Sequence, residues 1–223
     1  MIKLKDLLTE LDILDQGFLR AKSCKLKTEN SETNTFQMYH GGKRWSGLPS
    51  EILPSEKGRY EGGVGIYFTN KYETAVKYGR GSRVVHIVDI DKNYKDLEDV
   101  DISLDNLVNF VKNVYGLRKK KEIIEDMVNY SKRTNKTNIP AEVLNNLIVN
   151  YEAGAGKVGV EITKYFVSNG IDASLQHQSG GEEWLVVFNP KIIKKVSVVD
   201  PKMVKNDFEW MLPKCKEVKR SEC

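Results

Sequence analysis

Hydrophobic residues fall at helical spacing over the first part of the chain. Leucines recur every three or four positions and predict one apolar helix face: Leu4, Leu7, Leu8, Leu11 and Leu14. The polar stretch KTENSETNT follows and has the composition of a linker. Residues 1–35 are therefore predicted to be an amphipathic N-terminal segment and linker ahead of the main domain.

Short runs that alternate, or that are rich in β-branched residues, predict the strands of the main domain. The first half of the chain contains FQMYHGG, VGIYFT and SRVVHIVDI. The second half contains IDASLQ, EEWLVVFNP and KKVSVVD. The segment between the first two runs is rich in glycine and proline, which is typical of a loop.

Helical periodicity dominates the middle of the chain. It predicts helices over LDNLVNFVKNVYGL, KKKEIIEDMVNYSKRT and AEVLNNLIVNYEAG, the last of them starting after Pro140. A further helix, VGVEITKYFVSNG, is predicted to stop at Gly170. A shorter one, KYETAVKYG, follows the second strand. There Asn70 and Glu73 have capping-box spacing, and Gly79 is expected to end the helix in the left-handed conformation.

The order of these elements predicts the fold class. Strands come first, then helices, then strands again, so the regular alternation of a doubly wound parallel sheet is missing. This order predicts an α+β fold with two small sheets. The main domain is expected to span residues 36–200, with a helical insertion at about 95–150. Residues 201–223 are expected to form a basic C-terminal tail.

Composition narrows the class of protein. The chain of 223 residues is 40% hydrophobic and 30% charged, which is ordinary for a soluble globular protein. It contains no apolar run near the ~18 residues of a membrane helix, and its start lacks signal-peptide features. Three scattered cysteines favour reduced thiols and a cytoplasmic location. With three histidines and no C-x-x-C, no metal site is expected.

One phosphate-binding motif is present but poorly placed. GAGKVG, residues 154–159, satisfies the dinucleotide-loop pattern, which should follow a buried strand and open a helix. Here the preceding segment is helical in pattern, so a flexible joint between two helices is the favoured interpretation. Walker A, G-x-S-x-G and H-E-x-x-H motifs are all missing, which leaves kinase-like, serine hydrolase and zinc protease functions without support.

Three motifs on different predicted strands remain as candidate chemistry: YHGG, GIYFT with a following tyrosine, and GGEEWLVVF. Bare backbone at Gly41 could pair with a planar amide, because no side chain blocks the approach. Tyr67 and Tyr78, eleven residues apart, could stack on a flat ring. A carboxylate at the start of the last strand would stand at the rim of that slot. Taken singly, each of these is more often ordinary packing or solvated charge.

In this order, the three motifs resemble the ADP-ribosyltransferases of the His-Tyr-Glu class, which contains diphtheria toxin and the poly(ADP-ribose) polymerases. The resemblance covers roughly residues 36–200 without the helical middle. It implies a split β-sheet core with a helical insertion, and NAD as co-substrate. The eleven-residue gap between the tyrosines is part of the match.

The resemblance also implies a role for each matched residue. His40 would hydrogen-bond the adenosine-side ribose of NAD, and Gly41 would pair through its backbone with the nicotinamide carboxamide. Tyr67 and Tyr78 would sandwich the nicotinamide ring. A glutamate would bind the nicotinamide ribose and stabilise the positive charge that develops as the glycosidic bond breaks.

Two positions depart from the family pattern. Ala75 stands where the family often has a serine that bonds the carboxamide. The strand also offers two glutamates, Glu182 and Glu183, with one extra residue before the Asn189–Pro190 turn. Glu183 is favoured because it adjoins the aromatic-aliphatic run, and Glu182 is the alternative. The R-S-E class, which modifies arginine, has a Glu or Gln two residues before its catalytic glutamate and also a Ser-Thr-Ser strand. Both are missing here, where Gly180 and Gly181 precede the two glutamates, and this argues weakly against an arginine acceptor.

The resemblance thus predicts a mono-ADP-ribosyltransferase that modifies a protein side chain or a nucleic acid. The alternative is an inactive binding or structural module with the same fold. A net charge of +4 and the basic clusters LRKKKE and KCKEVKR permit a nucleic-acid acceptor, although such clusters are usually solvated surface. The opening leucine segment is faintly similar to leaders on phage proteins. A phage or bacterial effector or toxin acting in the cytoplasm, without a membrane partner, is therefore expected.

Overall fold

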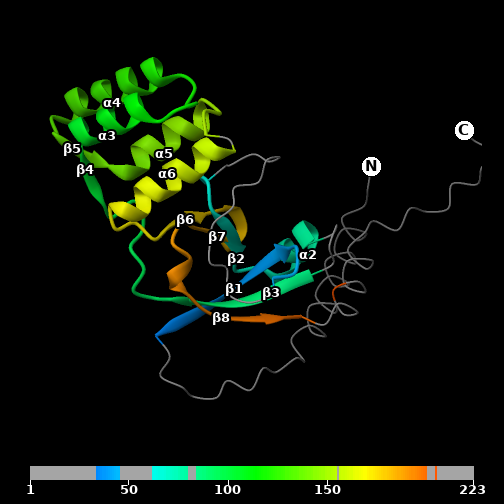
Figure 1. The fold of residues 1–223 in the computed structure, drawn as a ribbon. Coiled ribbons are helices and arrows are strands. Elements are labelled where there is room, and N and C mark those ends of the chain that lie inside the picture. Colours follow the sequence, from blue (N-terminus) through cyan, green and yellow to red (C-terminus); the bar gives the residue numbers. More distant parts are fainter. Residues whose placement is uncertain (1–33, 46–61, 80–83, 155, 200–203, 205–223) are drawn as a thin grey trace, which may run out of the picture. The chain divides into compact units, whose positions relative to one another are not determined.

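The computed structural model describes residues 34–45, 62–79, 84–154, 156–199 and 204 (Figure 1). All of them belong to one compact unit, Asn34–Cys223. The predicted N-terminal segment and linker lie outside the described residues except for Asn34 and Thr35. The predicted basic tail lies outside them except for Val204.

Six strands form one antiparallel sheet in the order β6-β7-β2-β1-β3-β8. The strands are β1 (Thr35–Gly42), β2 (Ile66–Thr69), β3 (Val84–Asp91), β6 (Ala173–His177), β7 (Glu183–Val187) and β8 (Ile193–Val198). All six predicted strands are therefore present. Together with the helices they confirm the α+β fold class.

The sheet is narrow at its middle. β1 pairs with β3 at eight successive positions, from Thr35–Asp91 to Gly42–Val84. In contrast, β1 and β2 pair only at Tyr39–Thr69. The expected two small sheets are thus corrected: two three-stranded halves join through this single pair into one sheet. A separate two-stranded ladder, β4 (Asp101–Ser103) with β5 (Asn138–Pro140), was not predicted, because three-residue strands carry no readable periodicity.

Four helices gather around one apolar core, in green and yellow in Figure 1: α3 (Leu104–Asn113), α4 (Lys120–Thr134), α5 (Ala141–Asn150) and α6 (Lys157–Ser168). Leu107, Ile123, Leu144 and Phe166 are fully buried there, together with Val186 of β7. The predicted helices are confirmed, and their observed ends differ from the predicted ones by at most four residues. In the described residues, no helix is long and apolar enough to cross a membrane.

The glycine motif at residues 154–159 follows α5, and its last three residues begin α6. It follows a helix and not a buried strand, so the dinucleotide-loop alternative is wrong. Its last glycine has a packing role, because a Cβ on Gly159 would come within 2.6 Å of the Val64 side chain. Gly170, after α6, has the left-handed backbone expected of a helix stop, with φ 78°.

The short helix after β2, α2 (Tyr72–Tyr78), begins differently from the prediction. Lys71 is its N-cap residue and no side chain caps it, so Asn70 and Glu73 do not form a capping box. Gly79 ends the helix at φ −71°, in the right-handed region and not the left-handed one. The side chain of Asn70 has another use, since it bonds to the backbone at Gly181 and Glu183 ahead of β7.

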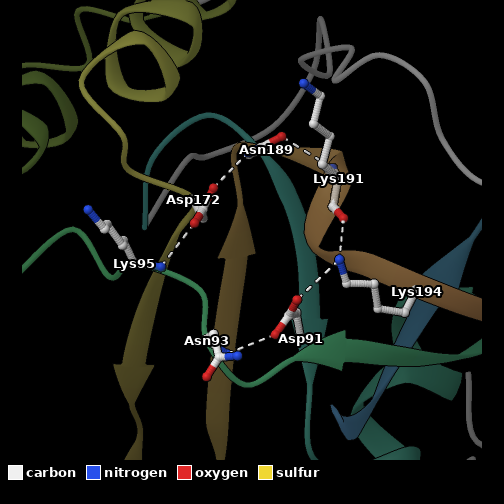
Figure 2. A network of polar contacts seen from close by, with 7 residues as sticks. All are labelled: Asp91, Asn93, Lys95, Asp172, Asn189, Lys191 and Lys194. Carbon is white, nitrogen blue, oxygen red and sulfur yellow. Dashed lines mark hydrogen bonds and ion pairs between the residues drawn. The ribbon is translucent and has the colours of Figure 1, made fainter. Parts of the chain in front are cut away.

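A polar network holds the far ends of β6, β7 and β8 together (Figure 2). Asn189 Nδ2 donates to Asp172 Oδ1 at 2.7 Å, and Asp172 Oδ2 accepts from the backbone of Lys95 at 3.0 Å. Lys194 of β8 donates to the backbone oxygen of Lys191 at 3.2 Å and forms an ion pair with Asp91 of β3 at 3.1 Å. These contacts fix the Asn189–Pro190 turn after β7, and so fix where that strand leaves the sheet.

Candidate functional site

The sequence-predicted residues come together around the middle of the sheet. β7, β2 and β1 are neighbours in that order, and α2 follows directly on β2 (Figure 1). His40 and Gly41 lie near the end of β1, Tyr67 lies in β2 and Glu183 opens β7. Three segments far apart in the sequence are therefore neighbours at the middle of the sheet. Their side chains divide between its two faces, because Tyr39 is opposite Thr69 and so His40 points the other way. Tyr67 shares the face of Thr69, whereas the His40 ring packs against Phe68 on the opposite face.

The junction is bridged by a side chain where the strand ladder stops. His40 Nδ1 lies 2.7 Å from the backbone oxygen of Tyr67. A carbonyl only accepts hydrogen bonds, so Nδ1 carries the proton and Nε2 is left as an acceptor. Burial, together with the nearby His86, lowers the pKa of His40 to about 4, although the bond to Tyr67 opposes this shift. At neutral pH the imidazole is therefore uncharged, with an acceptor nitrogen.

This pKa makes the fold sensitive to acid. Between the ordinary value of 6.5 and about 4, His40 binds a proton in the unfolded chain but not in the folded one. Unfolding is therefore favoured as the pH falls through that window. We expect denaturant titrations at pH 7 and pH 4.5 to differ by about 2–3 kcal/mol more in the wild type than in His40→Gln. The exposed His177 is the control, because His177→Gln should retain the full acid loss.

Glycine is needed at positions 41 and 42 for two different structural reasons. A Cβ on Gly41 would lie 1.8 Å from the backbone oxygen of Ala75, so β1 and α2 approach closely only because this residue is glycine. A Cβ on Gly42 would lie 2.7 Å from His40 Nε2. Gly42, which the sequence interpretation did not single out, therefore keeps the acceptor nitrogen clear.

The two tyrosines occupy different surroundings. The Tyr67 hydroxyl donates to the Gly63 oxygen at 2.6 Å and accepts from the Gly62 nitrogen at 3.1 Å, which anchors the entry to β2. Tyr78 is 67% exposed, and its ring stands edge-on to Trp184 at 6.4 Å. Pairing of the Tyr67 and Tyr78 rings around a flat ligand stays a prediction.

Ala75 is buried on the inner side of α2. It is 1% exposed and packs with Val76, Val85 and Val204. A serine hydroxyl at this position would enter an apolar cluster, and an unpaired buried hydroxyl is costly. The alanine is thus explained by packing, and Ala75→Ser is not a simple gain of one hydrogen bond.

Glu182 lies at the centre of a small polar group on the α2 side of the sheet. Its Oε1 accepts from Thr69 Oγ1 at 2.9 Å and from Trp184 Nε1 at 2.8 Å. Burial alone would raise the pKa of Glu182, but hydrogen bonds, led by that from Trp184, hold it below its ordinary value. Thr74 and Lys71 contribute to the same lowering. This carboxylate is therefore ionised at neutral pH and held in place from β2 and β7.

Glu183 projects from the opposite face of β7. Neighbouring strand residues point to opposite faces, so Glu183 shares a face with the buried Leu185, and Glu182 shares one with Trp184. Glu183 Oε1 lies 3.5 Å from Nδ1 of His177 on the edge strand β6. The two candidate glutamates therefore do not compete for one position.

The turn before Glu182 is hydrogen-bonded to Asn70 and Lys71, the two residues that follow β2. Gly180 and Gly181 both have left-handed backbone, with φ 70° and 69°. Lys71 Nζ donates to the Gly180 oxygen at 2.7 Å, and Asn70 Nδ2 donates to the Gly181 oxygen at 3.2 Å. Asn70 also accepts from the backbone nitrogen of Glu183 at 2.9 Å. These contacts fix the register of the strand that carries the carboxylate.

Thr69 and Trp184 were missed by the sequence interpretation, although one signal could have found them. In an antiparallel pair, residues directly opposite share a face, and Thr69 is opposite Trp184 in the ladder. Strand alternation alone puts Glu182 on the Trp184 face. With the register unknown, only adjacency to the apolar run favoured Glu183.

Other possible sites are weaker in the part of the chain that the structure describes. No group of three or more His, Cys, Asp or Glu residues there could hold a metal ion. Two shallow hollows lie between α3 and α6, beside the stacked rings of Phe110 and Tyr165. Neither hollow is lined by any of the sequence-predicted residues.

Comparisons with known proteins add little. No protein-family model matches the chain, and no curated protein matches it either. Among solved structures, the chain is similar to one described as an anti-CRISPR protein, with 13% sequence identity and a TM-score of 0.35. That match covers 76% of this chain and 100% of the other. A TM-score of this size carries no information on function.

Proposed function

We propose that the protein is an NAD-dependent mono-ADP-ribosyltransferase of the His-Tyr-Glu type, with the split sheet as its core and Glu182 as its carboxylate. One observation carries the proposal: an ionised, hydrogen-bonded Glu182 on the face of the sheet that α2 covers, next to the strand of Tyr67. The resemblance of the sequence motifs supplies the substrate class. The choice of Glu182 over Glu183 comes from the geometry.

The chemistry requires few groups. The bond between C1′ of the ribose and the nicotinamide nitrogen breaks, and nicotinamide leaves as a neutral molecule, so no general acid is needed. The sugar gains oxocarbenium character, which a fixed carboxylate stabilises. The acceptor then forms a bond to C1′ and gives up its proton to water. Trp184 and Thr69 hold Glu182 in advance, so little reorganisation is needed during the reaction.

The remaining residues are suited to holding NAD. His40 presents an acceptor nitrogen, which fits a ribose hydroxyl donor. Tyr78 offers an exposed ring on α2 next to Trp184. The macromolecular acceptor is a protein side chain by default, and a nucleic acid is the second choice. We further propose that such an enzyme acts in the cytoplasm as a phage or bacterial effector.

Labelled NAD tests the proposal directly. Purified protein is incubated with NAD labelled in the adenosine half and with bacterial lysate, and nicotinamide release is measured in parallel. We expect release of nicotinamide, and label in macromolecules that protease removes if the acceptor is protein or nuclease removes if it is nucleic acid. NAD binding without either product would support the inactive module. No binding and no release would overturn the proposal.

A further inference from the structure

Trp45 covers two neighbouring histidines on the face of the sheet that carries Phe68. His40 of β1 and His86 of β3 are directly opposite in the ladder, with ring centroids 5.7 Å apart. The indole of Trp45 stacks on both, at 4.7 Å from His40 and 4.4 Å from His86. The interplanar angles are 26° and 20°. The three rings therefore form one packed group, with the indole across both imidazoles.

Within this group of three rings, His86 is hydrogen-bonded to the backbone of Trp45. The Trp45 backbone nitrogen donates to His86 Nε2 at 3.1 Å. Nε2 must therefore be unprotonated, which puts the proton of neutral His86 on Nδ1. His86 is 0% exposed, and the group nearest to an acceptor for its Nδ1 is the His40 backbone, at a geometry poorer than that of a normal hydrogen bond. A buried donor with only a poor acceptor adds little stability, so stability alone does not explain an imidazole here.

We infer that His86 is a positioning residue for the NAD site: it anchors Trp45, and Trp45 in turn holds the ring of His40 with Nε2 directed past Gly42. The affinity part of this inference rests on the proposed function. His40 is fixed on one side by the Tyr67 carbonyl and on the other by the indole, so its acceptor nitrogen has a defined direction. Without the anchor, Trp45 and His40 gain alternative positions, and NAD binding weakens before the fold does.

Acid should release the same anchor. A protonated His86 would present N–H at Nε2 toward the Trp45 N–H, and two donors cannot bond. The charged or titratable groups that face His86 among the described residues are His40 on β1 and Arg44 after it, and β8 presents Val198 opposite. Burial, together with the Arg44 charge, lowers the pKa of His86 below 6.5, although a contact with the His40 backbone opposes the shift. Release therefore belongs to mildly acidic conditions.

Three variants of the full chain separate positioning from mere packing. His86→Phe keeps an aromatic ring but loses the acceptor, His86→Gln keeps an acceptor that does not titrate, and His177→Gln is the exposed control. Proteins are labelled with 5-fluorotryptophan, and the Trp45 signal is assigned with Trp45→Phe. NAD affinity is measured by calorimetry, and unfolding by denaturant.

For His86→Phe we expect a shifted Trp45 fluorine signal, NAD binding about 3- to 10-fold weaker and little change in stability, since one hydrogen bond is lost and one poorly paired buried donor is removed. His86→Gln should restore part of the affinity and abolish the acid-induced change in the Trp45 signal that begins below pH 6.5. An unshifted signal in His86→Phe, or lost stability with unchanged affinity, would overturn the inference. Wild-type protein that binds no NAD would overturn the proposed function and the affinity effect, while the fluorine signal still decides whether His86 positions Trp45.

Discussion

Glu182→Gln should lower nicotinamide release by about 10²–10³-fold, the usual cost of removing one preorganised electrostatic group. The amide has the same shape but no charge, so the positive charge on the sugar is no longer compensated in the transition state. Its oxygen can still accept from Thr69 and Trp184, as the carboxylate does at 2.9 and 2.8 Å. The free energy of unfolding should therefore change by less than about 1 kcal/mol.

Glu183→Gln is the matched control for this prediction. The two residues are neighbours with the same side chain, but Glu183 faces His177 on the other side of β7. Its replacement should leave the rate of nicotinamide release within about 2-fold of the wild type, since no charge is removed from the site. Rates of both variants at saturating NAD give the comparison. A large loss in Glu183→Gln alone would reverse the assignment, and equal rates in all three proteins would remove both carboxylates from the reaction.

The sequence predicted the local elements of this fold well, because strong periodicity determines them. The helical pattern after Pro140 became α5, and the β-branched run ending near Ile90 became β3. The motif residues could be placed at strand ends for the same reason. Local pattern does not, however, determine which strands pair, and the single pair Tyr39–Thr69 that joins the two halves of the sheet was not predictable.

The details of the site depended on contacts across long stretches of sequence. Asn70 is a residue type that often caps helices, but its side chain bonds to the backbone of a turn 111 residues later in the sequence. That tertiary contact prevailed over local capping chemistry. The choice between Glu182 and Glu183 was open at the sequence level for a similar reason. Which of the two side chains shares a face with Thr69 depends on the register of β7 against β2.

Gly41→Ala should be the most destabilising small substitution near the site. The new methyl carbon would stand 1.8 Å from the Ala75 oxygen and 2.6 Å from the Gly79 nitrogen, both of them backbone atoms. No side-chain rotation relieves that overlap, so α2 must move away from β1. Overpacking of this kind costs about 3 kcal/mol, and we expect a fall of about 6–12 °C in melting temperature. Because Tyr78 is on α2, NAD binding should fall with it.

Gly42→Ala separates stability from ligand binding at the next position. Its methyl carbon would meet His40 Nε2 at 2.7 Å, and a side chain can shift where a backbone cannot. The melting temperature should then fall by only about 2–4 °C, as for a change near 1 kcal/mol. NAD affinity should still fall by about 10-fold, because the acceptor nitrogen is covered or displaced. Calorimetry and thermal unfolding of both variants decide the matter. If Gly42→Ala binds NAD as the wild type does, His40 Nε2 makes no contact with the ligand, whereas a stable Gly41→Ala would show that α2 is not held against β1 as described.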